Sequence, residues 1–171
     1  FRVSTGKMLK FGIQNGLNVA RLGLTEDQIL TACSLADKTG YHSIWYMDHS
    51  NVPQWSNAIV NDPWVMLAGI AAVTNNVELG TCVTDALRRH PSNIALASIT
   101  LDRLSKGRGT LGIGAGEAQN LKEFNIPFDK PVSKFEEQLQ VIKQLYESDP
   151  DNRKTWEGKY YQLTEACLQA K

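Results

Sequence analysis

The chain alternates between short apolar runs and longer segments whose apolar positions recur at helical spacing. Four short runs, ending near residues 14, 47, 84 and 114, are apolar and bounded by turn-forming residues, a pattern that predicts strands. The segments between them carry apolar residues three and four positions apart, which is typical of helices with one buried face. The pattern therefore predicts four consecutive strand–helix units.

Several helix ends carry residues suited to capping. The predicted helix starts are Thr25 with Gln28 and Ser133 with Glu136, both at capping-box spacing, and Asp62 followed by Pro63. Gly40 and Gly107 stand where glycines commonly end helices. After the last helix, Trp156–Leu163 reads as a small hairpin.

Regular strand–helix units imply a parallel α/β sheet covered by helices. Two architectures fit: an open, doubly wound sheet, and a β/α barrel of which four units would be one half. A complete barrel takes about 250 residues, so a chain of 171 residues cannot close one alone. We expect residues 1–171 to form a single domain, and periodicity leaves both architectures open.

Composition narrows the function classes. Apolar residues make up 42% of the chain and charged residues 21%, as in ordinary globular proteins, which excludes a disordered tail. Eighteen basic and eighteen acidic residues give zero net charge, so no nucleic-acid partner is predicted. The longest apolar run, Trp64–Val73, is shorter than the roughly 20 residues that cross a membrane, so no membrane partner is predicted either.

The cysteines and histidines indicate neither a metal site nor a disulfide framework. The three cysteines are an odd number, widely spaced and without a CxxC motif, and the three histidines lack metal-ligand spacing. We therefore expect no metal and a reducing, cytoplasmic location.

Ligands of parallel α/β folds bind at the carboxyl ends of the strands, so the residues after each strand are the candidate site. Asp48-His49 follows the second strand, and an imidazole beside a carboxylate is a tunable proton donor or acceptor near neutral pH. The alternative is a loop histidine that only binds backbone. Asp48 also begins a polar loop of fourteen residues that ends at Asn61, and loops of that length are often functional. Trp55 in this loop could stack on a ligand or simply be buried.

The segment Gly112–Glu117 follows the fourth strand. It differs from the dinucleotide fingerprint GxGxxG because Glu117 stands in place of the third glycine, where its carboxylate would repel a pyrophosphate. Small residues there let a flat ligand lie against the backbone beside one carboxylate. The alternative is that the glycines ease packing and Glu117 caps the next helix. Arg88 and Arg89, after the third strand, could be solvated, pair with acids at helix ends, or meet an anionic ligand.

These motifs together resemble the luciferase-like flavin and deazaflavin oxidoreductases, and the resemblance covers nearly the whole chain from Lys10. The matching segments are Ile44–His49, Leu79–Thr84, Arg89–Pro91, Leu101–Arg108 and Leu111–Glu117. The Asp-His pair combined with Gly-Ala-Gly-Glu-Ala resembles the coenzyme F420-dependent branch, which holds methylenetetrahydromethanopterin reductase and F420-dependent sugar-phosphate and alcohol dehydrogenases. Gly-Lys-Tyr-Tyr at 158–161 fits the same branch.

The resemblance implies a (β/α)8 TIM barrel of which this chain covers about the first half, with the cofactor ring at the carboxyl-terminal mouth. It implies coenzyme F420 as cofactor, with FMN as the alternative. His49 and Glu117 map to proton-transfer roles, with Asp48 helping to place His49. The positions implied to contact the cofactor are Asp48, Cys82, Val83, Thr84, Ala115, Gly116, Asn120 and, with a spacing that differs by one, Trp55. A non-proline cis peptide is implied at Cys82–Val83.

The function expected from this resemblance is hydride transfer between a deazaflavin and a small organic substrate. An FMN-dependent monooxygenase is the alternative, and a non-catalytic flavoprotein or assembly scaffold is a third hypothesis. The family's members are about twice as long, with four more strand–helix units, so this chain is expected to be a fragment, to be incompletely recorded, or to pair with a second half-barrel. A homodimer through Pro63–Val73 and Pro91–Leu104 is expected, because these helices form the family's common interface.

Overall fold

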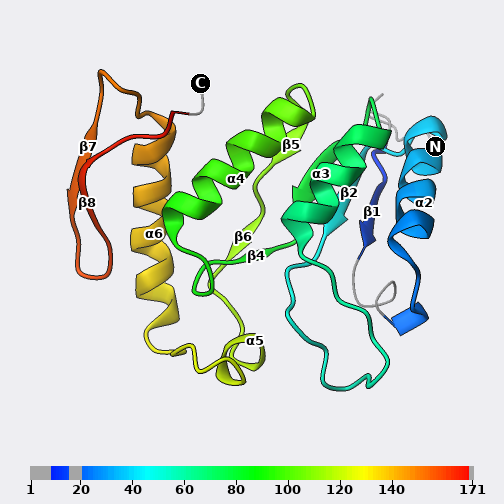
Figure 1. The fold of residues 1–171 in the computed structure, drawn as a ribbon, viewed down its shortest axis with the longest axis horizontal. Coiled ribbons are helices and arrows are strands. Elements are labelled where there is room, and N and C mark those ends of the chain that lie inside the picture. The colour runs from blue at the N-terminus through cyan, green and yellow to red at the C-terminus, as the bar shows by residue number, and fades with distance from the viewer. Residues whose placement is uncertain (1–8, 16–20, 170–171) are drawn as a thin grey trace.

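A four-stranded parallel sheet forms the centre of the fold. The computed structural model describes residues 9–15 and 21–169, and Figure 1 shows their arrangement. The main sheet contains β1 (Gly12–Asn15), β2 (Ser43–Tyr46), β3 (Glu78–Thr81) and β5 (Gly109–Thr110), in that spatial order. Every neighbouring pair is parallel, as the alternation of strands and helices predicts.

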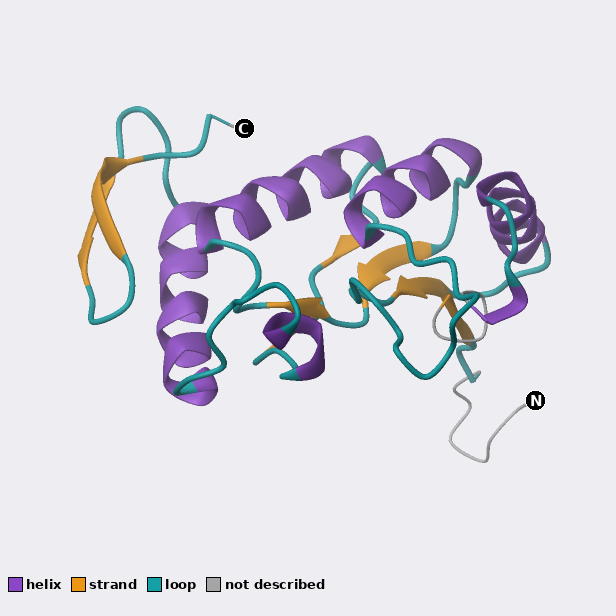
Figure 2. Cartoon of the chain, turned by 60° about the horizontal axis from the view of Figure 1, so that its bottom comes forward, coloured by secondary structure: helices purple, strands orange, loops and turns teal. Residues whose placement is uncertain are grey.

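The helices lie on one face of this sheet. They are α2 (Glu26–Lys38), α3 (Pro63–Val73), α4 (Pro91–Leu104) and α6 (Pro131–Tyr146). Figure 2 shows the helices along one side of the strands, with loops and the short α5 (Gln119–Lys122) on the other. A doubly wound sheet reverses its strand order and carries helices on both faces. Consecutive strand order with helices on one face is the wall of a β/α barrel, so the fold is α/β and forms about half of a (β/α)8 barrel.

Two predicted strands are each divided into two. The predicted strand that ends near residue 84 is β3 followed by β4 (Thr84–Asp85), and the one that ends near residue 114 is β5 followed by β6 (Ile113–Gly114). β4 and β6 pair with each other in a separate parallel sheet. The peptide bond Cys82–Val83 lies between β3 and β4 and is cis, as the resemblance implies. The break therefore redirects the chain at the edge where ligands are expected.

Most of the predicted helix ends are confirmed. The capping box of Thr25 and Gln28 is present, and the Asp62 carboxylate accepts the backbone N–H groups of Trp64 and Val65. The capping box at Ser133 and Glu136 is wrong. α6 begins two residues earlier, at Pro131, without a side-chain cap. Proline suits the first helical position because its fixed φ matches the helix and its missing N–H would have no partner within the helix, so the helix starts at Pro131 and Ser133 lies inside it.

Two apolar clusters stabilise the fold. The first packs α2 and α3 onto β2 and β3, with Ile44, Leu67, Ile70 and Leu79 fully buried. The second packs α4 against α6 and the terminal hairpin, around Ile94 and Val141. The predicted hairpin is present and consists of β7 (Lys154–Glu157) and β8 (Gln162–Ala166), in which Trp156 pairs with Leu163. The helices bury one stripe of side chains and the strands bury both faces. The spacing of apolar residues in the sequence therefore predicted these elements.

The segment Leu101–Arg108, which contributes to the family resemblance, has a structural explanation. Arg108 donates to the main-chain oxygens of Thr74 and Val77 at 3.0 Å and 2.7 Å, beyond the end of α3. Asp102 accepts the Gly109 N–H at 3.0 Å. A Cβ on Gly109 would lie 2.7 Å from the backbone of Asp102. These contacts fix the start of β5 and so the register of the strand that leads to the candidate site.

Within residues 9–15 and 21–169, no helix is both long enough and apolar enough to cross a membrane.

Candidate active site

A cleft of about 250 Å³ lies at the edge of the sheet where the segments after β2, β3 and β5 begin. It gathers nine of the ten residues proposed from the sequence; only Trp55 is missing. The lining residues are Asp48, His49, Cys82, Val83, Thr84, Asp85, Gly114, Ala115, Gly116, Glu117 and Asn120. They come from three segments far apart in the sequence. Their convergence follows from parallel strands ending at one edge.

His49 and Glu117 face each other in this cleft. The Nδ1 atom of His49 lies 4.0 Å from Oε2 of Glu117, which is beyond hydrogen-bond distance. This Nδ1 atom is buried and has no hydrogen-bond partner among the described residues. The His49 side chain is 21% exposed and that of Glu117 is 55% exposed. An imidazole and a carboxylate so placed can exchange a proton with a group that enters between them.

The Glu117 carboxylate forms no capping hydrogen bond with the start of α5, the helix that follows it. The interaction of its charge with the helix dipole stays a prediction. The carboxylate instead accepts a hydrogen bond from Asn120 Nδ2 at 3.1 Å. Oδ1 of Asn120 is buried without a partner in the described part of the chain. Oδ2 of Asp85, which also lines the cleft, lacks a partner in the same way. Among the described residues the cleft therefore holds three unsatisfied polar atoms, which a polar ligand could satisfy.

The glycines of the candidate site are required by close packing. A Cβ on Gly112 would lie 1.9 Å from the main-chain oxygen of Thr81, and a Cβ on Gly114 would lie 2.7 Å from the Val83 side chain. Gly116 has φ +86°, which favours glycine, and its Cβ would lie 2.7 Å from Asp85 Oδ1. Gly112 and Gly114 thus fit the packing explanation. Gly116 lets the chain turn so that Glu117 reaches the cleft.

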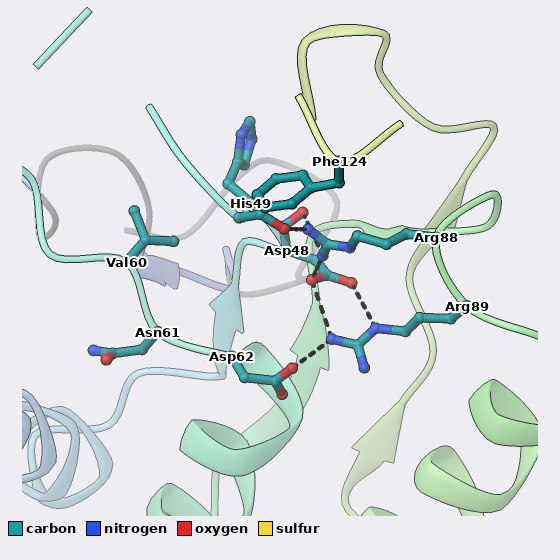
Figure 3. Close-up of a pocket in the computed structure, with 9 residues that line it drawn as sticks. Asp48, His49, Val60, Asn61, Asp62, Arg88, Arg89 and Phe124 are labelled. Atoms are coloured by element: carbon teal, nitrogen blue, oxygen red, sulfur yellow. Dashed lines mark hydrogen bonds and ion pairs between the residues drawn. The ribbon is translucent and has the colours of Figure 1, made fainter. Parts of the chain in front are cut away.

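Asp48 is tied to arginines, as Figure 3 shows. Its buried carboxylate accepts hydrogen bonds from Arg88 and, at 3.2 Å, from Nε of Arg89. It also accepts the Thr84 hydroxyl at 2.5 Å and the Asp85 N–H at 3.2 Å. Among the described residues no hydrogen bond joins this carboxylate to the His49 ring. Asp48 therefore does not place the imidazole by a hydrogen bond to its ring, and its expected help in placing His49 stays a prediction.

Thr84 has its hydroxyl occupied inside the protein. The hydroxyl donates to Asp48 and accepts from Trp64 Nε1 at 3.3 Å, and the residue is fully buried. This leaves its backbone as the part that borders the cleft.

Arg88 and Arg89 form an ion-pair network around Asp48. Arg89 also pairs with Asp62, the cap of α3, which confirms for this residue the expected contact with an acid at a helix end. Arg89 reaches from Asp48 to Asp62 at 2.5 Å, so it joins the two ends of the long loop. Burial and the neighbouring charge of Arg89 lower the pKa of Arg88 to about 10. The adjacent arginines after a strand end were visible in the sequence, but their partner Asp48 lies forty residues away.

Trp55 does not line the cleft. It borders a different cavity, formed by the long loop and Glu123, and its ring lies 5.9 Å from the Arg21 guanidinium. Trp55 was expected to contact the cofactor, but the structure places it outside the cleft that the other nine candidate residues line.

A second cavity of about 460 Å³ shares Asp48 and His49 with the cleft. Val60, Asn61 and Phe124 contribute to its wall (Figure 3), and none of these three was predicted from the sequence as a site residue. Nothing in their local pattern distinguishes them, because the long loop and the segment after α5 meet only in the folded chain. His49 therefore stands between two cavities.

The cleft suits an aromatic ring with polar edges. The cis peptide Cys82–Val83 and the backbone of Gly114–Gly116 form its sides, and His49 Nδ1 and Asn120 Oδ1 lack partners. A flavin-like or deazaflavin-like ring presents such edges. Among the described residues no group of three or more His, Cys, Asp or Glu side chains is placed to hold a metal ion.

Comparison with known proteins identifies the relatives of this chain. The sequence model of the family described as luciferase-like monooxygenase matches residues 9–171. A phthiodiolone/phenolphthiodiolone dimycocerosates ketoreductase of Mycobacterium tuberculosis is 34% identical over 161 residues, covering 82% of this chain and 42% of that protein. An F420-dependent glucose-6-phosphate dehydrogenase of Kineococcus radiotolerans is 38% identical over 137 residues, covering 78% and 40%.

A solved structure agrees with this relationship. An F420-dependent secondary alcohol dehydrogenase, in complex with an F420-acetone adduct, superposes with a TM-score of 0.83 at 26% identity. The match covers 95% of this chain and 48% of that one. The chain thus spans about half the length of the relatives it matches.

Proposed function

The chain belongs to the luciferase-like monooxygenase family, and from this membership we propose that the protein is a coenzyme F420-dependent oxidoreductase. The substrate would be an organic alcohol, sugar phosphate or carbonyl compound, or a reduced-pterin carrier as in methylenetetrahydromethanopterin reductase. The observation that carries the proposal is the His49–Glu117 pair in a cleft bounded by Cys82–Val83 and Gly114–Gly116. The F420-dependent relatives support the choice of cofactor.

When bound, the deazaflavin would supply the hydride chemistry. The backbone of Cys82–Val83 would support one side of its ring, and Ala115, Gly116 and Asn120 would border it. These contacts would fix the orientation of the ring relative to His49. Orientation of this kind contributes much of an enzyme's rate because the reacting groups no longer have to find each other.

His49 would exchange a proton with the substrate oxygen. Its Nδ1 atom is buried without a partner, so a hydroxyl or carbonyl group could bind there without displacing a protein contact. Its position between the cleft and the second cavity lets one face of the imidazole meet a substrate while the ring remains close to the cofactor position.

Glu117 would balance charge near the cofactor position. Its carboxylate is oriented by Asn120 Nδ2 and remains half exposed. A carboxylate held in this way can accept a proton or stabilise a developing positive charge.

A spectroscopic binding experiment tests the proposed cofactor. The purified protein is incubated with F420 or with FMN, freed of unbound ligand and measured by absorption. We expect retained absorbance near the wavelength in nanometres that gives F420 its name. Retention of FMN alone would favour the monooxygenase alternative, and retention of neither would contradict both.

We also propose that the protein forms a homodimer through α3 and α4. Val65, Leu96 and Leu104 on these helices are large apolar residues with exposed fractions of 71%, 46% and 56%. An apolar groove runs between the two helices, lined in part by Ala68 and Ala97. Such exposed apolar surface often marks an interface. Light scattering on the purified chain, whose monomer mass is 19.0 kDa, is expected to give twice that mass; a single monomeric species would contradict the dimer.

A cytoplasmic location is part of the same proposal. Cys33, Cys82 and Cys167 are all free thiols, as is usual in a reducing compartment.

A further inference from the structure

The orientation of the His49 ring depends on its backbone. Nδ1 of the imidazole is buried and has no hydrogen-bond partner in the described part of the chain, and Glu117 is 4.0 Å away. A ring that its own hydrogen bonds do not hold takes its position from the main chain and from packing. Whatever fixes residues 48 and 50 therefore fixes the imidazole.

Arg88 contacts both residues that flank His49. Its Nη2 atom donates to the main-chain oxygen of Asp48 at 3.2 Å and to the Asp48 carboxylate. Its Nη1 atom donates to the hydroxyl of Ser50. We propose that Arg88 is a positioning residue for His49, holding the backbone on both sides of the imidazole; the catalytic consequence of this role rests on the proposed function.

Arg88 is itself held firmly. The carboxylate of Asp85 accepts the backbone N–H groups of Leu87 at 2.8 Å and Arg88 at 3.2 Å. The Asp85 N–H donates in turn to the Asp48 carboxylate. The Arg88 side chain is only 13% exposed. The guanidinium is thus a fixed support that joins the loop after β4 to the loop after β2.

The guanidinium group suits this task because its donors form a planar fork. One terminal nitrogen donates a hydrogen bond to Asp48, the residue before His49, and the other donates to Ser50, the residue after it. A lysine carries its donors on a single nitrogen. It could keep the charge next to Asp48 but is not expected to hold both flanks at once.

Arg89 is a matched control within the same cluster. It also pairs with the Asp48 carboxylate, but its other partner is Asp62 at the far end of the loop. None of the interactions found for Arg89 reaches Ser50 or the main chain of Asp48. Removing Arg89 therefore removes a similar charge from Asp48 while leaving the flanks of His49 in place.

The direct test is nuclear magnetic resonance of the ligand-free protein with labelled histidine. The chain contains three histidines, so the ring signal of His49 can be assigned with a His49→Gln variant. Arg88→Ala is expected to shift or broaden the His49 signal while those of His42 and His90 stay in place. Arg89→Ala is expected to change the His49 signal less, and added guanidinium ion should restore it in Arg88→Ala.

Kinetics provide the second readout. With bound cofactor, Arg88→Ala should lower kcat by about 10–100-fold, as small misplacements of a reacting group do, with a smaller change in KM. Arg88→Lys should recover only part of the loss. If the wild-type protein binds no F420 and has no turnover, the proposed function fails, while the His49 signal still decides whether Arg88 positions the ring.

An unchanged His49 signal in Arg88→Ala would overturn the proposal, as would equal changes in Arg88→Ala and Arg89→Ala. If Arg88→Ala does not fold, Ser50→Ala and Arg88→Lys decide instead. Ser50 is exposed, so its loss spares the fold but removes one of the two flanking contacts. Altered His49 signals in both variants would support the proposal, and unaltered signals in both would overturn it.

Discussion

Replacing Asp37 with Asn tests how a single buried carboxylate joins α2 to the start of β3. Asp37 lies at the end of α2 and is 7% exposed. Its Oδ1 atom accepts the backbone N–H groups of Asn76 and Val77, each at 2.8 Å, and Oδ2 accepts that of Asn75 at 3.0 Å. These bonds fix the turn that places β3 beside β2.

The size of the effect follows from these bonds. An amide retains one acceptor oxygen, so two of the three backbone bonds survive without charge. The amide nitrogen then faces the Asn75 N–H, donor to donor, and that bond is lost. A hydrogen bond to a charged group contributes about 1.5–3 kcal/mol and a neutral one about 0.5–1.5 kcal/mol. The lost bond, together with the weakening of the other two by about 1–1.5 kcal/mol each, gives an expected loss of about 3.5–6 kcal/mol.

Thermal unfolding followed by circular dichroism measures this loss. In a domain of this size 1 kcal/mol corresponds to about 2–4 °C, so Tm should fall by roughly 7–24 °C. Asp27→Asn is the matched control, because Asp27 lies exposed in the first turn of the same helix. Its loss removes only a favourable helix-dipole interaction of at most about 1 kcal/mol.

The pH dependence of the difference provides a further check. Although burial alone raises the pKa of Asp37, the hydrogen bonds from Asn75, Val77 and Asn76 together lower it below its usual value of 3.8. A group with a lowered folded-state pKa stabilises the protein above the unfolded pKa, and this contribution is lost as the pH falls through the folded pKa. The gap between the wild type and Asp37→Asn should thus be full at pH 7 and shrink below about pH 4. Equal Tm values for Asp37→Asn and Asp27→Asn, or a gap that does not depend on pH, would refute this reasoning.

Three further predictions concern the site and the hairpin. Glu117→Gln should lower turnover by about 10²-fold while folding persists; unchanged turnover would contradict a proton role and favour the non-catalytic hypothesis. His49→Ala should lower turnover more than it weakens cofactor binding, which steady-state kinetics and a binding titration separate; a variant that loses the cofactor but keeps its full rate at saturation would make His49 a binding residue. Glu137→Gln should speed amide hydrogen exchange at residues 159–161, because the Glu137 carboxylate accepts the backbone N–H groups of all three; unchanged exchange there would show that the hairpin does not depend on this carboxylate.

The amino-acid sequence alone determined the local elements of this protein. Apolar spacing identified the helices and their order, and the cap at Thr25 and the Asp62-Pro63 start were read from short-range chemistry. Residues after the strands were correctly expected to meet, because parallel strands end at one edge. Nine of the ten candidate residues accordingly line one cleft. These features depend on neighbours within a few residues or on a general rule of sheet geometry.

Only the tertiary structure decided which distant groups become partners. Periodicity records that a face is buried but not what covers it, so it could not choose between a barrel wall and a doubly wound sheet; the consecutive strand order did. The Asp48 carboxylate stands next to His49 in the sequence, yet it pairs with Arg88 and Arg89 from another loop. A buried carboxylate needs a nearby cation to offset its desolvation, and the fold supplied the cations from forty residues away.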